Sequence, residues 1–252
     1  MRREEIVLEI KDLAVKVDDR LVLEGLNLSV RRGEVHVIFG QNGSGKSTLL
    51  GAIMGLSRYR VTEGDILFLG SSVLGLSIHE RARLGIGLAF QSPRAVRGVS
   101  LRSFLKLVAK DSEAFEGVME LASEFNFHQH LDRDLNVGFS GGEMKKSEVL
   151  QLIAQDPTLL MLDEPESGVD FENIALLGEA LRRFLEREKP FHQRTKSAIL
   201  ITHSGHILDY VTADVGHVMV KGRFACSGNP YDIFRRIREK GYAECVECYL
   251  CL

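Results

Sequence analysis

Hydrophobic and polar residues alternate along the first thirty residues of the chain. A period of two turns one face of a strand toward a core and the other toward solvent, as in antiparallel strands with one covered face. The chain is therefore expected to begin with half-buried antiparallel strands. The apolar residues of this pattern are Ile6, Leu8, Ile10, Val15, Val17, Leu26, Leu28 and Val30.

Four short, almost wholly apolar runs follow later in the chain. Runs that are apolar on both faces are typical of central parallel strands covered by helices. The first three are followed directly by Gly40, Asp163 and His203, and an open α/β sheet binds ligands at the carboxyl ends of its strands. The sequence therefore predicts an α/β fold with a site where these strands end. The runs are VHVIF ending at Phe39, LLML ending at Leu162, AILIT ending at Thr202 and VGHVMV ending at Val220.

Helical periodicity replaces this pattern between about residues 93 and 157, as in SLRSFLKLVAK and EAFEGVMELASEF. We interpret this segment as a mostly helical subdomain inserted into the α/β core. A chain of 252 residues is long enough for one such domain spanning residues 1–252.

Composition narrows the class of protein. A formal net charge of −3 argues against nucleic acid as the main partner, since phosphate binding needs a clustered basic surface. No apolar stretch approaches the roughly 18 residues that span a bilayer. The N-terminal residues have no apolar signal-peptide core, and the four cysteines form no disulfide framework, so we expect a cytoplasmic protein.

GQNGSGKST is a complete phosphate-binding loop, placed after a predicted strand and before a predicted helix. Its glycines let backbone N–H groups turn toward phosphate oxygens at the positive end of the helix. Lys46 is expected to reach the β- and γ-phosphates of ATP, and the Ser47 hydroxyl to bind Mg²⁺. The nucleotide-binding residues predicted from this loop are Gly40, Gln41, Asn42, Gly43, Ser44, Gly45, Lys46, Ser47 and Thr48.

LLMLDEPESGVD ends a predicted buried strand in two adjacent carboxylates. Asp163 is expected to hold Mg²⁺, directly or through water, and Glu164 to polarise the attacking water, since phosphoryl transfer depends on such positioning. Many strands end in a solvated aspartate, so this motif alone is weak evidence. It gains weight because it follows the phosphate-binding loop in the same chain.

FSGGE has the S-x-x-E spacing of a helix capping box, between Ser140 and Glu143. The free helix N-terminus, with Gly141 and Gly142, makes a second anion site. One chain already has one phosphate cradle, so a second one predicts that another subunit completes the site. In isolation, S-G-G-E is an ordinary helix cap.

These motifs, in this order, resemble the phosphate loop, signature motif and Mg²⁺-binding strand of ABC ATPases. The resemblance implies a P-loop NTPase core that hydrolyses ATP and dimerises when ATP binds. It also implies that Gln91 contacts Mg²⁺, that His203 contacts the γ-phosphate and that the loop from Ser167 to Asp170 crosses the dimer interface. Where this family usually stacks an aromatic residue on adenine, the chain has Val17, which predicts apolar packing instead.

Several segments resemble the SufC-type ATPases of the Suf iron–sulfur cluster assembly system more than transporter subunits, among them SGGEMKKSE and THSGHILDYVTADVGHVMVKGRFACSG. This resemblance implies a partner scaffold of the SufB or SufD type. The alternative is the nucleotide-binding subunit of an ABC membrane transporter, the only case in which a membrane partner is expected. FSGGE and His203 argue against a monomeric P-loop kinase, and the intact catalytic residues argue against a scaffold that does not hydrolyse ATP.

The last eight residues contain Cys245, Cys248 and Cys251, each three residues apart. C-x-x-C spacing lets two thiolates reach one metal ion, so these cysteines are candidate ligands of an Fe–S cluster or Zn²⁺. Packing along one face of a terminal helical turn explains the same spacing.

Overall fold

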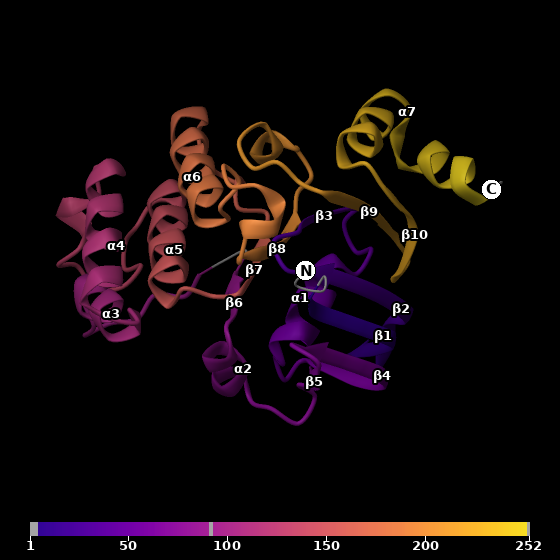
Figure 1. The fold of residues 1–252 in the computed structure, drawn as a ribbon, viewed down its shortest axis with the longest axis horizontal. Helices are drawn as coiled ribbons and strands as arrows, with labels where there is room; N and C mark the ends of the chain where they lie inside the picture. The colour runs from indigo at the N-terminus through magenta and orange to yellow at the C-terminus, as the bar shows by residue number, and fades with distance from the viewer. Residues whose placement is uncertain (1–4, 91–92, 251–252) are drawn as a thin grey trace.

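The computed structural model describes residues 5–90 and 93–250 of the chain, with side chains described as far as residue 242. Its secondary structure forms two sheets and a group of helices (Figure 1).

The first sheet is antiparallel, with strand order β2-β1-β4-β5. The alternating segment at the start of the chain forms β1 and β2, as the period-two pattern predicts. Asp18 and Asp19 connect these two strands with positive φ angles of 47° and 62°. Two consecutive residues in that region make a tight hairpin turn that suits the twist of paired strands. The strands are β1 (Ile6–Val17), β2 (Arg20–Arg31), β4 (Tyr59–Phe68) and β5 (Ser71–Ser72).

The second sheet has strand order β10-β9-β3-β8-β7-β6, and all its neighbouring strands are parallel except β10, which runs antiparallel to β9. The parallel strands therefore end along one edge of the sheet, as the runs of apolar residues predicted. The strands are β3 (Val35–Phe39), β6 (Ile86–Ala89), β7 (Leu159–Asp163), β8 (Ser197–Ile201), β9 (Val215–Val220) and β10 (Arg223–Gly228).

Helices cover both faces of this sheet. Helix α1 lies on the face toward the antiparallel sheet, whereas α5 and α6 lie on the other face (Figure 1). Helices α3, α4 and α5 stand at the end of the molecule far from the antiparallel sheet, and they fall within or begin inside the segment predicted to be helical. The helices are α1 (Lys46–Met54), α2 (Ile78–Leu84), α3 (Leu101–Val108), α4 (Ser112–Glu124), α5 (Gly141–Gln155), α6 (Phe171–Phe184) and α7 (Pro230–Leu250), with short 3₁₀ helices at His128–His130, Phe191–Gln193 and His206–Asp209.

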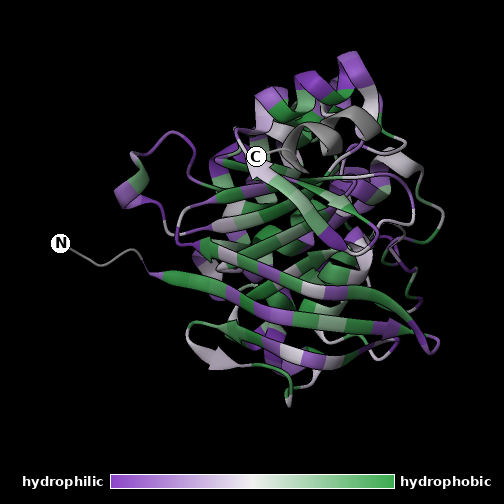
Figure 2. Ribbon diagram, turned by 90° about the vertical axis from the view of Figure 1, so that its right-hand side faces the viewer, coloured by the Kyte–Doolittle hydropathy of each residue, from purple (hydrophilic) through white to green (hydrophobic). Residues whose placement is uncertain are grey.

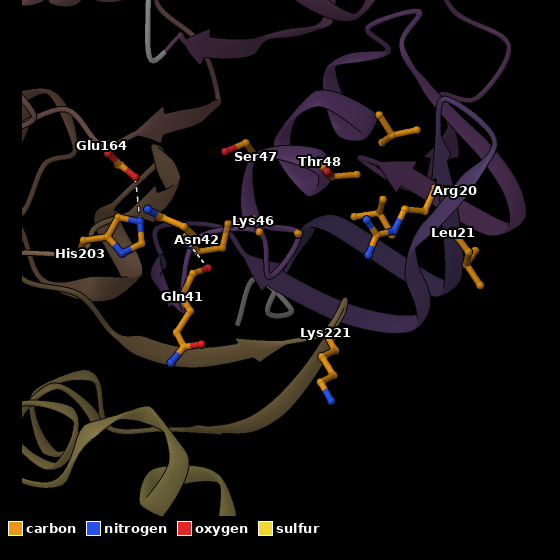
Figure 3. Close-up of a pocket in the computed structure, with 14 residues that line it drawn as sticks. Arg20, Leu21, Gln41, Asn42, Lys46, Ser47, Thr48, Glu164, His203 and Lys221 are labelled. Carbon is orange, nitrogen blue, oxygen red and sulfur yellow. Dashed lines mark hydrogen bonds and ion pairs between the residues drawn. The ribbon is translucent and has the colours of Figure 1, made fainter.

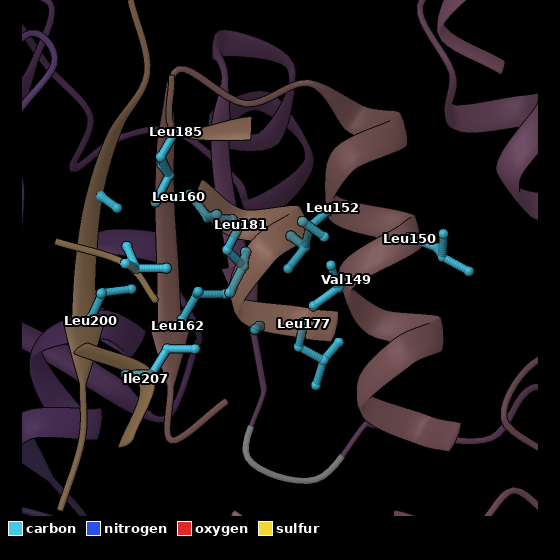
Figure 4. Close-up of a cluster of buried hydrophobic side chains, with 14 of the residues drawn as sticks. Val149, Leu150, Leu152, Leu160, Leu162, Leu177, Leu181, Leu185, Leu200 and Ile207 are labelled. Atoms are coloured by element: carbon cyan, nitrogen blue, oxygen red, sulfur yellow. The ribbon is translucent and has the colours of Figure 1, made fainter. Parts of the chain in front are cut away.

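Alternating residues of the central strands divide between two hydrophobic cores. Leu160 and Leu162 pack with Leu177 and Leu181 of α6 on one face (Figure 4), whereas Met161 faces the core shared with α1 and the antiparallel sheet. In Figure 2 hydrophobic residues concentrate in the stacked strands, and hydrophilic residues gather in the turns and the outer helices. Because both faces are covered, the sheet is rigid, and its carboxyl edge holds the loops that follow in fixed positions.

Candidate functional site

The phosphate loop lies between β3 and the N-terminus of α1 and requires glycine at two positions. A Cβ on Gly40 would lie 2.6 Å from the carbonyl oxygen of Met219, and Gly45 has a φ of +112°. A side chain at position 40 would displace backbone, and one at position 45 would be strained by the positive φ. The loop therefore keeps the close turn that directs backbone N–H groups into a cradle.

Lys46 is buried in this cradle, with 5% of its surface exposed. Its Nζ donates hydrogen bonds to the carbonyl oxygens of Gly40 at 2.7 Å and of Gln41 at 3.0 Å. Burial lowers the pKa of Lys46, while the carboxylates of Glu164 and Asp163 act in the opposite direction. The ammonium group is thus held where the phosphates of a bound nucleotide would lie.

Ser44 offers an independent sign that the cradle fits an anion. Its hydroxyl oxygen is buried and has no hydrogen-bond partner among the described residues. Buried hydroxyls are rarely left unpaired in proteins, since desolvation costs free energy that a partner would recover. A phosphate oxygen in the loop would provide that partner.

Asp163 ends β7 beside the start of α1, and its side chain is buried. Burial raises the pKa of Asp163; Glu164 adds to this effect, and a hydrogen bond from the Ser47 hydroxyl opposes it. A hydroxyl and a carboxylate in contact are the hard oxygen ligands that Mg²⁺ takes. Ser47 and Asp163 therefore fit the predicted magnesium site, whereas Gln91, the third predicted ligand, lies outside the described residues.

Glu164 and His203 face each other across the ends of β7 and β8 (Figure 3). Glu164 Oε1 lies 2.8 Å from His203 Nε2. The backbone of Glu164 is left-handed, with a φ of 51°, and its N–H donates to the carbonyl oxygen of Ile201 at 3.0 Å. A non-glycine residue in this region is uncommon and is often found at functional sites. The pair places a carboxylate and an imidazole at the mouth of the phosphate loop.

One cavity of about 1300 Å³ joins these groups. The predicted residues Lys46, Glu164, His203 and Val17 all line it. Sequence reasoning missed four other lining residues, because they belong to no motif and only the folding of two hairpins brings them there. These are Arg20, Leu21, Val22 and Lys221.

Glu166 is a further residue that the motifs did not reveal. Its buried Oε1 accepts hydrogen bonds from the hydroxyls of Thr202 and, at 3.0 Å, of Ser204, the residues on either side of His203. Its other oxygen is buried without a partner among the described residues. The Glu166 carboxylate links the loop after β7 to the loop that carries His203. This contact can be predicted only once β7 is known to pair with β8.

The signature motif begins α5 and forms the predicted capping box. The Ser140 hydroxyl accepts from the N–H of Glu143 at 3.4 Å, and Glu143 Oε2 accepts from the N–H of Ser140 at 2.7 Å. Neither these two residues nor Gly141 and Gly142 line the described walls of the phosphate-loop cavity. One copy of the chain therefore does not bring its signature motif to its own phosphate loop.

The candidate cysteine ligands lie where the structure gives no test. Cys245 and Cys248 fall in α7, in the part whose side chains are outside the description, and Cys251 lies outside the described residues. Among the described residues, no group of three or more His, Cys, Asp or Glu side chains is arranged to hold a metal ion. No helix in the described ranges is both long and apolar enough to cross a membrane.

Comparison with known proteins identifies relatives over nearly the whole chain. The sequence profile of the ABC transporter family matches residues 23–167. The probable ATP-dependent transporter SufC of Escherichia coli K12 is 36% identical over 255 residues, which cover 96% of this chain and 99% of that protein. The probable ATP-dependent transporter ycf16 of Cyanophora paradoxa is 38% identical over 250 residues, or 94% of this chain and 93% of that protein.

Solved structures agree in fold. An ATP-binding subunit of an ABC transporter superposes with a TM-score of 0.79 at 25% identity, covering 97% of this chain and 99% of that one. A nucleotide-free ATP-binding cassette from an ABC transporter gives a TM-score of 0.75 at 22% identity, covering 95% of this chain and 98% of that one.

Proposed function

Since this chain belongs to the ABC transporter family and is an ATP-binding subunit with ATPase activity, we propose that its cavity at the phosphate loop is the hydrolytic site and that it drives Suf-type iron–sulfur cluster assembly. The observation that carries the first part is the convergence of Lys46, Glu164 and His203 on one cavity from three separate segments of the chain.

The proposal gives each predicted site residue one role in hydrolysis. Lys46 exchanges its contacts with loop carbonyls for oxygens of the β- and γ-phosphates. Ser47 and Asp163 would hold Mg²⁺, with Gln91 as the third ligand that the family resemblance implies, and the ion would neutralise charge on the phosphates. Glu164 orients the attacking water and draws on its proton, and His203 holds both the Glu164 carboxylate and the γ-phosphate. Phosphoryl transfer asks little more of a protein than this positioning.

Substitutions at the cavity test the hydrolytic assignment. Lys46→Ala is expected to abolish ATP binding, because it removes the cation that faces the phosphates. Glu164→Gln is expected to keep ATP binding and to lower kcat by at least about 100-fold, a typical contribution of a positioned base. Calorimetry measures binding and phosphate release measures turnover, with the exposed Glu113→Gln as the matched control. Wild-type turnover in Glu164→Gln would contradict the role given to Glu164.

The composite site requires two copies of the chain. The signature motif stays away from the cavity of its own chain, so in a C₂ dimer Ser140, Gly141, Gly142 and Glu143 are placed over the γ-phosphate held by the partner copy. We propose that ATP brings the two copies together, that hydrolysis separates them, and that the segment of about residues 93–157 moves as an inserted helical subdomain during this cycle.

The proposed partner is a cytoplasmic scaffold of the SufB or SufD type. The similarity to SufC of Escherichia coli supports this choice, because it covers nearly all of both chains. The second candidate is a transporter subunit, which the match to the ATP-binding subunit of an ABC transporter favours. Both partners would dock on the helical subdomain near Gln91, between about residues 92 and 110.

Capture of the native complex distinguishes these partners. The tagged full-length chain is purified from its own cells, and the co-purifying proteins are identified by mass spectrometry. A scaffold protein without membrane spans supports the Suf assignment, and an integral membrane protein overturns it in favour of transport. Arg97→Glu, an exposed charge reversal after Gln91, is expected to reduce capture of the partner without changing the Kd for ATP.

A further inference from the structure

The cavity has two chemically different ends. The phosphate loop, Glu164 and His203 make one end polar and charged. The other end is lined by Val17, Arg20, Leu21, Val22 and Lys221. A nucleotide with its phosphates in the loop extends its base toward this second end, and none of these five residues is aromatic.

The Arg20 side chain is available for a ligand. The two acidic residues beside it in the hairpin turn pair with other arginines. Asp18 pairs with Arg58 at 3.3 Å and Asp19 with Arg60 at 3.0 Å, and the side chains of both pairs are exposed. Among the described residues, no ion pair or hydrogen bond is found for the side chain of Arg20. In Figure 3 this side chain extends from the start of β2 toward the side of Thr48, while Leu21 turns away from it.

The hairpin between β9 and β10 closes the second wall of this end. The N–H of Gly222 donates to the carbonyl oxygen of Ser44 at 2.8 Å, and its own carbonyl accepts from the N–H of Glu24 at 3.3 Å. A Cβ on Gly222 would lie 1.9 Å from the carbonyl oxygen of Val22. This close contact fixes Lys221 at the cavity and joins the phosphate loop to β2.

From this arrangement we propose that Arg20 stacks its guanidinium on the purine base of the bound nucleotide. Arg20 has the only planar, delocalised side chain among the five residues at this end of the cavity. A guanidinium stacks on aromatic faces, whereas the compact ammonium of Lys221 suits ribose or phosphate oxygens. Val17, Leu21 and Val22 supply the apolar surface beneath, so the base is held between hydrocarbon and a planar cation.

This inference rests on the proposed nucleotide site. Its test distinguishes the contribution of the base to affinity from that of the phosphates. Titration calorimetry measures the Kd of ADP and of inorganic tripolyphosphate for wild type, Arg20→Ala, Arg20→Tyr and Arg60→Ala. Arg20→Ala is expected to bind ADP about tenfold more weakly and to keep the tripolyphosphate Kd within about twofold. Arg20→Tyr is expected to restore ADP binding, because an aromatic ring also stacks on the base. Arg60→Ala is the control, since Arg60 lies on the neighbouring strand β4, pairs with Asp19 and does not line the cavity.

Two results would overturn the role of Arg20. Unchanged ADP affinity in Arg20→Ala would show that the guanidinium makes no contact, and an equal loss of tripolyphosphate affinity would show that it binds phosphate instead. Lys46→Ala distinguishes either result from failure of the site itself. If wild type binds ADP and Lys46→Ala does not, the nucleotide site stands and only the role of Arg20 is lost.

Discussion

At the scale of single residues, a chain of hydrogen-bonded groups joins β3 to β9 and β10. His36 Nδ1 lies 2.9 Å from His217 Nε2, His36 Nε2 lies 3.0 Å from Glu34 Oε2, and His217 Nδ1 lies 2.7 Å from Ser227 Oγ. Both imidazoles are buried, with 3% and 6% of their surface exposed. Burial lowers the pKa of His217 to about 3, and the neighbouring His36 adds to the effect.

This shift makes stability depend on pH below neutrality. The unfolded chain takes up a proton at His217 near pH 6.5, whereas the folded chain does so only near pH 3. Between these values the unfolded state binds more protons, so stability is full above pH 6.5 and falls as the pH falls. Wild type is expected to lose about 2 kcal/mol more than His217→Gln between pH 7 and pH 5. Urea unfolding at both pH values measures this difference. The exposed His192→Gln should behave as wild type, and an equal pH dependence of His217→Gln would contradict the assignment.

At the scale of elements, a buried ion pair joins α5 to the end of β6. Lys145 Nζ lies 3.3 Å from Glu148 Oε2 and donates to the carbonyl oxygen of Phe90 at 3.0 Å. Glu148 Oε1 accepts from the N–H of Phe90 at 2.6 Å, and burial raises the pKa of Glu148. Lys145 and Glu148 of α5 therefore bind the carbonyl oxygen and the N–H of Phe90, the residue before Gln91.

Loss of both partners of this pair should cost less free energy of unfolding than the two single losses added together. Lys145→Met leaves the Glu148 carboxylate buried without its cation and is expected to destabilise the chain by about 3 to 5 kcal/mol. Glu148→Gln keeps an acceptor for the N–H of Phe90. The double variant is therefore expected to be less destabilised than the two single variants added together. Urea unfolding of the four proteins measures the coupling, and simple additivity would show that the two side chains do not act as a pair.

At the scale of the whole molecule, the cavity and the signature motif lie apart in one chain. If the partner copy completes the site, a bulky cation at Ser140 blocks the closed dimer without disturbing the cavity. Ser140→Arg, in a Glu164→Gln background, is expected to bind ADP within about twofold of its parent and to form no dimer with ATP. Size-exclusion chromatography with ATP reports the dimer, and Ser123→Arg on the exposed face of α4 is the matched control. A dimer population equal to that of the parent would exclude the shared site.

The sequence by itself determined the parts of this protein that depend on neighbouring residues. Alternation predicted β1 and β2, and unbroken apolar runs predicted the central parallel strands. The phosphate loop could also be predicted from its motif and from the strand and helix that flank it, although the contact that requires glycine at position 40 is with Met219 of β9. The capping box of α5 spans only four residues and forms as its spacing predicts. The geometry of these elements depends mainly on residues close together in the sequence, so they could be predicted before any tertiary contact was known.

Only the tertiary structure decided which distant residues meet. Glu166 contacts Thr202 because β7 and β8 pair side by side, and His36 meets His217 because β3 pairs with β9. Arg20 and Lys221 reach one cavity because two hairpins fold against the phosphate loop. No spacing rule connects such residues, since they come from separate strands whose pairing is decided by how both faces of one sheet are buried. Motifs predict the residues at the phosphate end of the cavity. The residues at the base end come together only when the two sheets pack against each other.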